Sequence, residues 1–224
     1  MTPEQIDATL DAAEASPARL NGIGYWDVVA AVKRDPSLVE PYADRIGAID
    51  QAWFRSAVPI ALPLWLGTAI ALGGTLAALV LIGIAYRAAE PWNGISFLAG
   101  TVGLIVATHG LGHLAVGSVF GIRFTAWFAF FRRPQPGVKI DYASYLRAPA
   151  RHRAWMHAGG AVISKAIPFV LIPSAVIAGV PWWGVAVLLA LAIGQVVTDV
   201  LWSTKSSDWS RYLREMAIAR EYEP

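Results

Sequence analysis

The sequence has no cysteine and few charged residues. None of the 224 residues is Cys, and Asp, Glu, Lys and Arg together make up only 15% of the chain. The absence of thiols excludes cysteine nucleophiles and zinc sites built from thiolates. Because ordinary soluble domains contain about 25% charged residues, the low charge content argues against a simple soluble domain. The net charge of +2 is too small to indicate a nucleic-acid partner.

Apolar residues make up 56% of the chain and are concentrated after residue 57. Four stretches, at about 58–86, 95–122, 158–180 and 182–203, are long enough to cross a bilayer, which takes about 20 apolar residues. No signal peptide precedes them, so the first is expected to be an internal signal anchor. No internal repeat of the kind found in transporters with duplicated halves is visible. These features predict an all-α polytopic membrane protein with four transmembrane helices, surrounded by the lipid bilayer.

The distribution of Lys and Arg predicts the orientation of the spans. Basic residues gather before the first span, between the second and third, and after the fourth, whereas the other two connections hold almost none. Since basic loops stay on the cytoplasmic side, both termini are expected in the cytoplasm, with the chain in the plasma (inner) membrane. The predicted organisation is a cytosolic segment at 1–57, a transmembrane domain at 58–203 with a cytoplasmic loop at 123–157, and a cytosolic tail at 204–224.

The amino-terminal segment 1–57 is expected to be helical. Thr2 stands before Pro3 and acidic residues, which is the pattern of a helix that begins with a capping hydroxyl. Further helices are predicted at 24–33 and 39–55. No residue pattern here indicates a chemical function, so the segment is interpreted as a short cytosolic helical unit or as a helix at the membrane surface.

Four ionisable side chains lie inside the predicted spans: His109, His113, Lys165 and Asp199. A charged group at a helix centre costs at least about 2.5–3.5 kcal/mol in lipid, so each of them marks a candidate functional site. His109 and His113 are spaced i, i+4 and project from one face of a helix, as histidines do when two of them bind one zinc ion. The alternative is a pair of histidines that form hydrogen bonds between helices.

A catalytic zinc site takes three protein ligands and keeps one open position. Without cysteine, the third ligand must be a carboxylate or another histidine, and Asp199 is the leading candidate. The competing interpretation pairs Asp199 with Lys165, which lies on the third span, inside the membrane and near the same cytoplasmic side. His152 and His157, at the cytoplasmic mouth of that span, are expected to lie at the interface rather than to bind metal.

Four short segments form an ordered set: THGLGH at 108–113, GIRFT at 121–125, AGGAVI at 158–163 and VTDV at 197–200. In this order they resemble the HExxH motif, the following strand-forming segment, the AGPxxN-like core helix and the metal-binding Asp of the site-2 protease family of intramembrane zinc metalloproteases. The resemblance covers about residues 95–203. It implies a three-helix core that holds zinc through His109, His113 and Asp199, near the cytoplasmic side.

The departures from the family pattern concern catalysis. Where the family has the Glu that activates the attacking water, this chain has Gly110. General-base assistance contributes about 10²–10⁴-fold to a reaction rate, and glycine has no side chain to supply it. Asp208 and His157 are candidates for a substitute base that acts through a water molecule. The family's Pro, Asn and Gly positions are also changed, to Gly160, Ile163 and Val200.

The loop after the second span is rich in aromatic residues. Its segment 123–131 is too short to span a membrane, and Pro134 and Pro136 then favour a turn. The resemblance implies strands here, to which an unwound substrate adds as an edge strand, with Phe124, Thr125 and Trp127 in the substrate-binding region. The alternative is an aromatic belt at the membrane interface with a basic rim that attracts anionic lipid.

Three functions remain open. The first is a divergent site-2-protease-like protein with zinc as its cofactor, reduced or absent peptidase activity, and a transmembrane protein as its substrate or client. The second is an active intramembrane zinc metalloprotease with an unconventional base. The third is a small transporter in which Lys165, Asp199 and the two histidines form a proton or ion relay.

Overall fold

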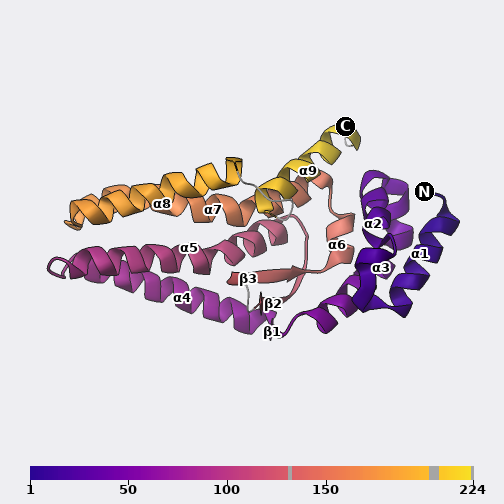
Figure 1. Cartoon of the computed structure of the whole chain (residues 1–224), viewed down its shortest axis with the longest axis horizontal. Coiled ribbons are helices and arrows are strands. Elements are labelled where there is room, and N and C mark those ends of the chain that lie inside the picture. The colour runs from indigo at the N-terminus through magenta and orange to yellow at the C-terminus, as the bar shows by residue number, and fades with distance from the viewer. Residues whose placement is uncertain (131–132, 202–206, 223–224) are drawn as a thin grey trace. The chain divides into compact units, whose positions relative to one another are not determined.

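The computed structural model describes residues 1–130, 133–201 and 207–222, and Figure 1 shows the order of the elements along the chain. The described residues form two compact units. Unit 1 consists of residues 1–64, 117–154 and 213–224, and unit 2 of residues 65–116 and 155–212. Unit 1 therefore combines the amino-terminal segment with the loop after the second span and with the carboxy-terminal tail.

The amino-terminal helices of unit 1 enclose an apolar core. They are α1 (Pro3–Ala15), α2 (Tyr25–Arg34) and α3 (Pro36–Ala57), with a 3₁₀ helix, η1 (Pro17–Gly22), after α1. The predicted capping hydroxyl is present, because Thr2 accepts a hydrogen bond from the backbone amide of Gln5. Apolar side chains recur every three or four residues along these helices and form the core, among them Ile6, Leu10, Val28, Val32 and Ile46. This spacing explains why so polar a segment folds.

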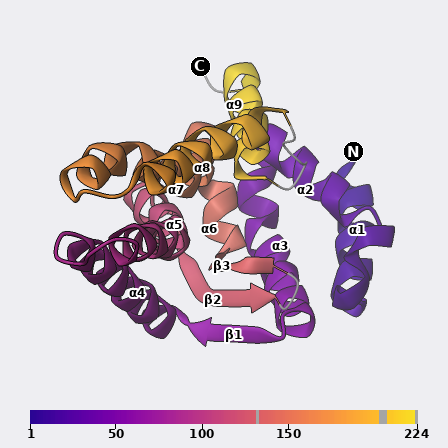
Figure 2. The ribbon, with the colours of Figure 1, turned by 60° about the vertical axis from the view of Figure 1, so that its left-hand side comes forward.

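Unit 1 also contains a small antiparallel sheet, shown in Figure 2. Its strands are β1 (Ile60–Pro63), β2 (Phe124–Phe130) and β3 (Arg133–Ile140), in the order β1-β2-β3, and a short helix, α6 (Tyr142–Arg147), follows. Trp127 of β2 is buried and pairs with Leu62 on one side and Val138 on the other. The sheet corrects the prediction of an all-α chain, because the aromatic residues at 124–130 form a strand.

A buried carboxylate joins distant parts of unit 1. Glu215, on the last helix α9 (Asp208–Tyr222), is only 4% exposed. It accepts hydrogen bonds from Lys33 Nζ at 2.6 Å, Arg153 Nε at 2.7 Å and the Tyr145 hydroxyl at 2.9 Å. Burial alone raises the pKa of Glu215, but the charges of Lys33 and Arg153 and their hydrogen bonds outweigh it and lower the pKa to about 2. The carboxylate is therefore ionised at neutral pH.

This network predicts that unit 1 loses stability in acid. A carboxylate whose pKa is lowered on folding contributes stability above its unfolded pKa of about 4.5, and that stability is lost as the pH falls from about 4.5 to about 2. The shift corresponds to about 3 kcal/mol, so hydrogen exchange of the α6 amides, corrected for intrinsic rates, should become about 100-fold faster between pH 6 and pH 2. Glu215→Gln should abolish this dependence, and an equally steep loss of protection in that variant would contradict the prediction.

In the described part of the chain, four helices are long and apolar enough to cross a membrane. They are α4 (Leu64–Ala85), α5 (Trp92–Val119), α7 (Ala150–Ile177) and α8 (Trp182–Leu201). Many of their large apolar side chains are exposed, as lipid-facing helices require. The four predicted spans are thus confirmed, although the third helix begins at Ala150 rather than at about residue 158. The chain is a polytopic helical membrane protein.

Candidate metal centre

The candidate site begins with the two histidines of α5. His109 and His113 lie one helical turn apart, with ring centroids separated by 4.8 Å in an edge-to-face arrangement. Their Nε2 atoms are 3.2 Å apart. The i, i+4 spacing therefore brings the two imidazoles together as the sequence predicts.

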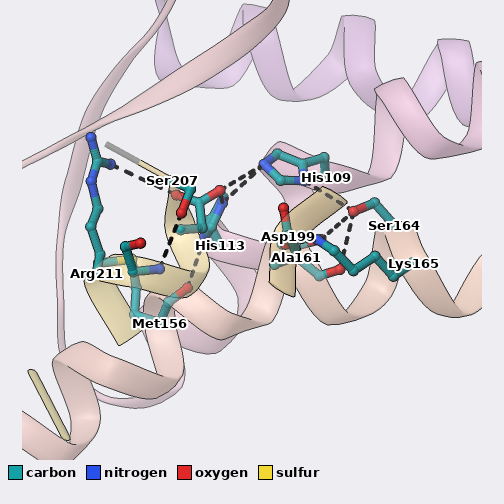
Figure 3. Close-up of polar contacts among 12 residues, drawn as sticks. His109, His113, Met156, Ala161, Ser164, Lys165, Asp199, Ser207 and Arg211 are labelled. Atoms are coloured by element: carbon teal, nitrogen blue, oxygen red, sulfur yellow. Dashed lines mark hydrogen bonds and ion pairs between the residues drawn. The ribbon is translucent and has the colours of Figure 1, made fainter. Parts of the chain in front are cut away.

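Helix α7 fixes the orientation of both rings (Figure 3). His113 Nδ1 lies 2.8 Å from the Met156 carbonyl oxygen, and His109 Nδ1 lies 3.2 Å from Ser164 Oγ. A carbonyl only accepts, so His113 Nδ1 carries the hydrogen. When Ser164 Oγ donates to the Gly160 carbonyl at 2.9 Å, it accepts from His109 Nδ1. In this arrangement of neutral imidazoles, both Nε2 atoms bear lone pairs.

Glycines allow α5 and α7 to approach closely enough for these hydrogen bonds. A Cβ atom on Gly160 would lie 2.6 Å from the backbone oxygen of His109 and would also collide with the His113 ring. A Cβ atom on Gly112 would lie 2.8 Å from the carbonyl oxygen of Gly159. The absence of side chains at these positions lets α7 reach both histidines.

The third group of the cluster is Asp208, the first residue of α9. Its Oδ2 atom lies 3.2 Å from His109 Nε2 and 3.3 Å from His113 Nε2. Burial by itself raises the pKa of Asp208, but a proton on either facing imidazole lowers it well below its ordinary value. The carboxylate is therefore ionised at neutral pH. Among the described residues, His109, His113 and Asp208 form a group that could hold a metal ion.

The two Nε2 atoms and the Asp208 carboxylate favour a cation between them. With Nδ1 of each histidine already donating, the two Nε2 atoms and the carboxylate oxygen all face one another with lone pairs, at 3.2–3.3 Å. Three acceptors at this distance repel unless a positive charge lies among them. A single proton lies on one nitrogen and serves at most two of the contacts, whereas a metal ion serves all three. The donor set therefore fits a metal.

The dimensions of the triangle fit zinc. Zinc–nitrogen and zinc–oxygen distances of about 2.0–2.1 Å place tetrahedral donor atoms about 3.3 Å apart, and the three edges here measure 3.2, 3.2 and 3.3 Å. The side chains of His109, His113 and Asp208 are 14, 12 and 23% exposed. A fourth ligand can therefore approach the triangle, as in zinc sites that keep an open position.

Asp199, the predicted third ligand, does not lie with the histidines. Its Oδ2 atom is 2.6 Å from Lys165 Nζ, and Asp208 takes the place beside His109 and His113. This corrects the sequence-based assignment in favour of the competing ion pair. The physical reason is that Lys165 also lies within an apolar helix, where an unpaired ammonium is costly, and Asp199 neutralises it.

The two remaining histidines have other surroundings. His152 belongs to unit 1, and its ring stacks on Phe120 with centroids 4.3 Å apart. His157 is buried on α7 and lies outside the group of donors that can share a metal in the described part of the chain. That both lie at the membrane interface and bind no metal stays a prediction. Of the two candidate substitute bases, His157 and Asp208, the second belongs to the donor triangle itself.

The predicted substrate-binding residues lie on an interior strand. Phe124, Thr125 and Trp127 belong to β2, which pairs with β1 on one side and β3 on the other. An added peptide strand needs an unpaired edge, so β2 does not offer one. In the described sheet, the edge strands are β1 and β3.

Sequence reasoning missed three parts of the site. Asp208 was considered only as a substitute base, and neither Met156 nor Ser164 carries a sequence signal for its role. The one usable signal for Asp208 is an acidic residue at the start of a helix that follows a span.

Comparison of the chain with protein-family models, with curated proteins and with solved structures gives no match.

Proposed function

We propose that the chain is a membrane-embedded zinc protein of the site-2-protease type, in which His109, His113 and Asp208 hold one zinc ion. The observation that carries this proposal is the triangle of three lone-pair donors 3.2–3.3 Å apart in a polytopic membrane protein. A zinc ion bound with an open position acts as a Lewis acid and lowers the pKa of water. The carboxylate departs from the family pattern, because Asp208 supplies it in place of Asp199.

The proposed peptidase activity is reduced or absent. Gly110 follows the first histidine, where the family has its general base, and glycine can neither accept nor return a proton. The protein would then bind a transmembrane client without cutting it efficiently. Among the described strands, the outer edges of β1 and β3 support this role, because extended peptides add to such edges.

The basic residues support an orientation with both termini in the cytoplasm and the chain in the plasma (inner) membrane. The relay function has less support. Lys165 and Asp199 neutralise each other at 2.6 Å, and a relay needs groups that exchange protons or ions with their surroundings.

Zinc analysis of the full chain, purified in detergent without chelator, tests the proposal. We expect about one zinc per chain in the unchanged protein and none above background in His113→Ala or Asp208→Asn, because each variant loses a ligand. Asp199→Asn is the matched control, since it removes a carboxylate of the same unit that pairs with Lys165 and lies outside the donor group. Zinc lost from Asp199→Asn and retained by Asp208→Asn would reject the proposed ligand set, and an unchanged chain without any metal would reject the site.

A further inference from the structure

We propose that Tyr212 is a positioning residue for the metal centre: with Trp155 and Trp209 it forms an aromatic clasp that holds Asp208 against the histidines. The inference rests on the proposed function, because it concerns the same donor set. All the residues involved belong to unit 2.

The clasp joins the first turns of α9 to α7. The Tyr212 ring packs edge-on against Trp155 of α7, with centroids 5.6 Å apart at 62°, and stacks on Trp209 with centroids 5.0 Å apart at 23°. Both separations lie in the favourable range for aromatic pairs. Tyr212 is therefore held between two indole rings, one from its own helix and one from α7.

Helical spacing links the clasp to the carboxylate. Asp208 and Tyr212 are spaced i, i+4 on α9 and so lie on the same face of that helix. The face that presents Asp208 to His109 and His113 thus also presents Tyr212 to α7. A contact that fixes Tyr212 fixes the direction in which Asp208 points.

The same turn of α7 supports a histidine as well. Trp155 immediately precedes Met156, whose carbonyl oxygen accepts the hydrogen bond from His113 Nδ1 (Figure 3). One short stretch of α7 therefore holds His113 through a backbone group and Asp208 through an aromatic ring. Binding sites need their donors placed to within about 0.5 Å, and a shared support achieves this for groups from two different helices.

Among the described residues, the charged side chain beside Asp208 other than the two histidines is Arg211. Arg211 NH1 is 3.7 Å from Asp208 Oδ1, which is longer than a hydrogen bond. Asp208 is also the first residue of its helix, where helices fray most readily. Ser207 Oγ caps this end by accepting a hydrogen bond from the Ser210 amide at 3.1 Å, and the ring contacts of Tyr212 tie it to α7.

The test uses the full chain in detergent micelles, with Co²⁺ as a spectroscopic probe of the zinc site. Tyr212→Ala should weaken Co²⁺ binding about 10–100-fold, the range for loss of a supporting contact, and its visible spectrum should approach that of Asp208→Ala. Tyr212→Phe keeps the ring and should restore both affinity and spectrum. The matched control is Phe120→Ala, which removes the stacked Phe120–His152 pair of unit 1 and should leave Co²⁺ binding unchanged.

Two results would overturn the clasp. One is equal Co²⁺ affinity and spectrum in Tyr212→Ala and Tyr212→Phe; the other is a loss in Phe120→Ala as large as in Tyr212→Ala, which would show general destabilisation. If the unchanged chain binds neither Co²⁺ nor Zn²⁺, the proposed function fails, and the clasp is then judged by hydrogen exchange of the amides at 209–213. Exchange at least about 10-fold faster in Tyr212→Ala than in Tyr212→Phe supports it, and equal exchange rejects it.

Discussion

Gly110→Glu should raise cleavage of a membrane-spanning substrate by about 10²–10⁴-fold, the contribution of a general base. The substitution places a carboxylate directly after His109, at the position where the site-2 proteases, which this sequence resembles, carry theirs. The carboxylate would take a proton from the attacking water and later return it to the leaving amine. The measurement is mass spectrometry of cleavage products from a panel of single-span membrane proteins incorporated into liposomes with the purified chain.

Two control variants and the unchanged chain are measured beside Gly110→Glu. Gly110→Gln matches the size of Gly110→Glu without its basicity and should stay at the level of the unchanged protein. Gly110→Glu combined with His113→Ala should be inactive, because it lacks a metal ligand. If the unchanged chain cleaves as fast as Gly110→Glu, the proposed loss of the general base is contradicted. That result would favour an active protease with an unconventional base.

Gly160→Ala should weaken zinc binding by more than about 100-fold, beyond the usual effect of a single supporting contact. The new methyl group would meet the backbone oxygen of His109 at 2.6 Å and the ring of His113. Since a backbone atom of a helix does not yield, α5 must move away from α7. Both supporting hydrogen bonds, to Met156 and to Ser164, would then lengthen together. Competition of the purified variant with a zinc-binding dye measures the loss.

Gly194→Ala is the matched control for this substitution. Gly194 lies on α8 of the same unit, and a methyl group there meets nothing within 4 Å. Alanine in a helix interior is about 1 kcal/mol more favourable than glycine, so this variant should be at least as stable as the unchanged protein and should bind zinc normally. Normal zinc affinity in Gly160→Ala would show that the close approach of α5 to α7 is not needed for the site.

The local part of the site follows from the sequence, whereas the long-range part does not. His109 and His113 belong to one helix, so their spacing alone places them on one face. Asp208 comes from a helix beyond the last span, where hydropathy says nothing about position. Asp199 looked more suitable because it lies within a span, but the cost of an unpaired Lys165 in lipid decides its pairing.

In the fold as well, the local elements follow from the sequence and the long-range contacts do not. Long apolar stretches predict α4, α5, α7 and α8 because a bilayer sets their length. The resemblance implies strands in the loop after the second span, but composition alone does not separate a short aromatic strand from an interfacial belt. The pairing of β1 with β2 was missed because β1 lies far along the chain from β2. No local pattern marks Glu215 as the partner of both Lys33 and Arg153, since the three come from separate segments of unit 1.

X-ray absorption at the zinc edge, on the full chain purified with its native metal, tests most directly whether the three donors share one ion. The account predicts nitrogen and oxygen scatterers at about 2.0–2.2 Å and outer-shell scattering from two imidazoles in the unchanged chain, and no zinc signal above background in Asp208→Asn. A zinc spectrum without imidazole scattering, or one that Asp208→Asn leaves unchanged, would contradict it.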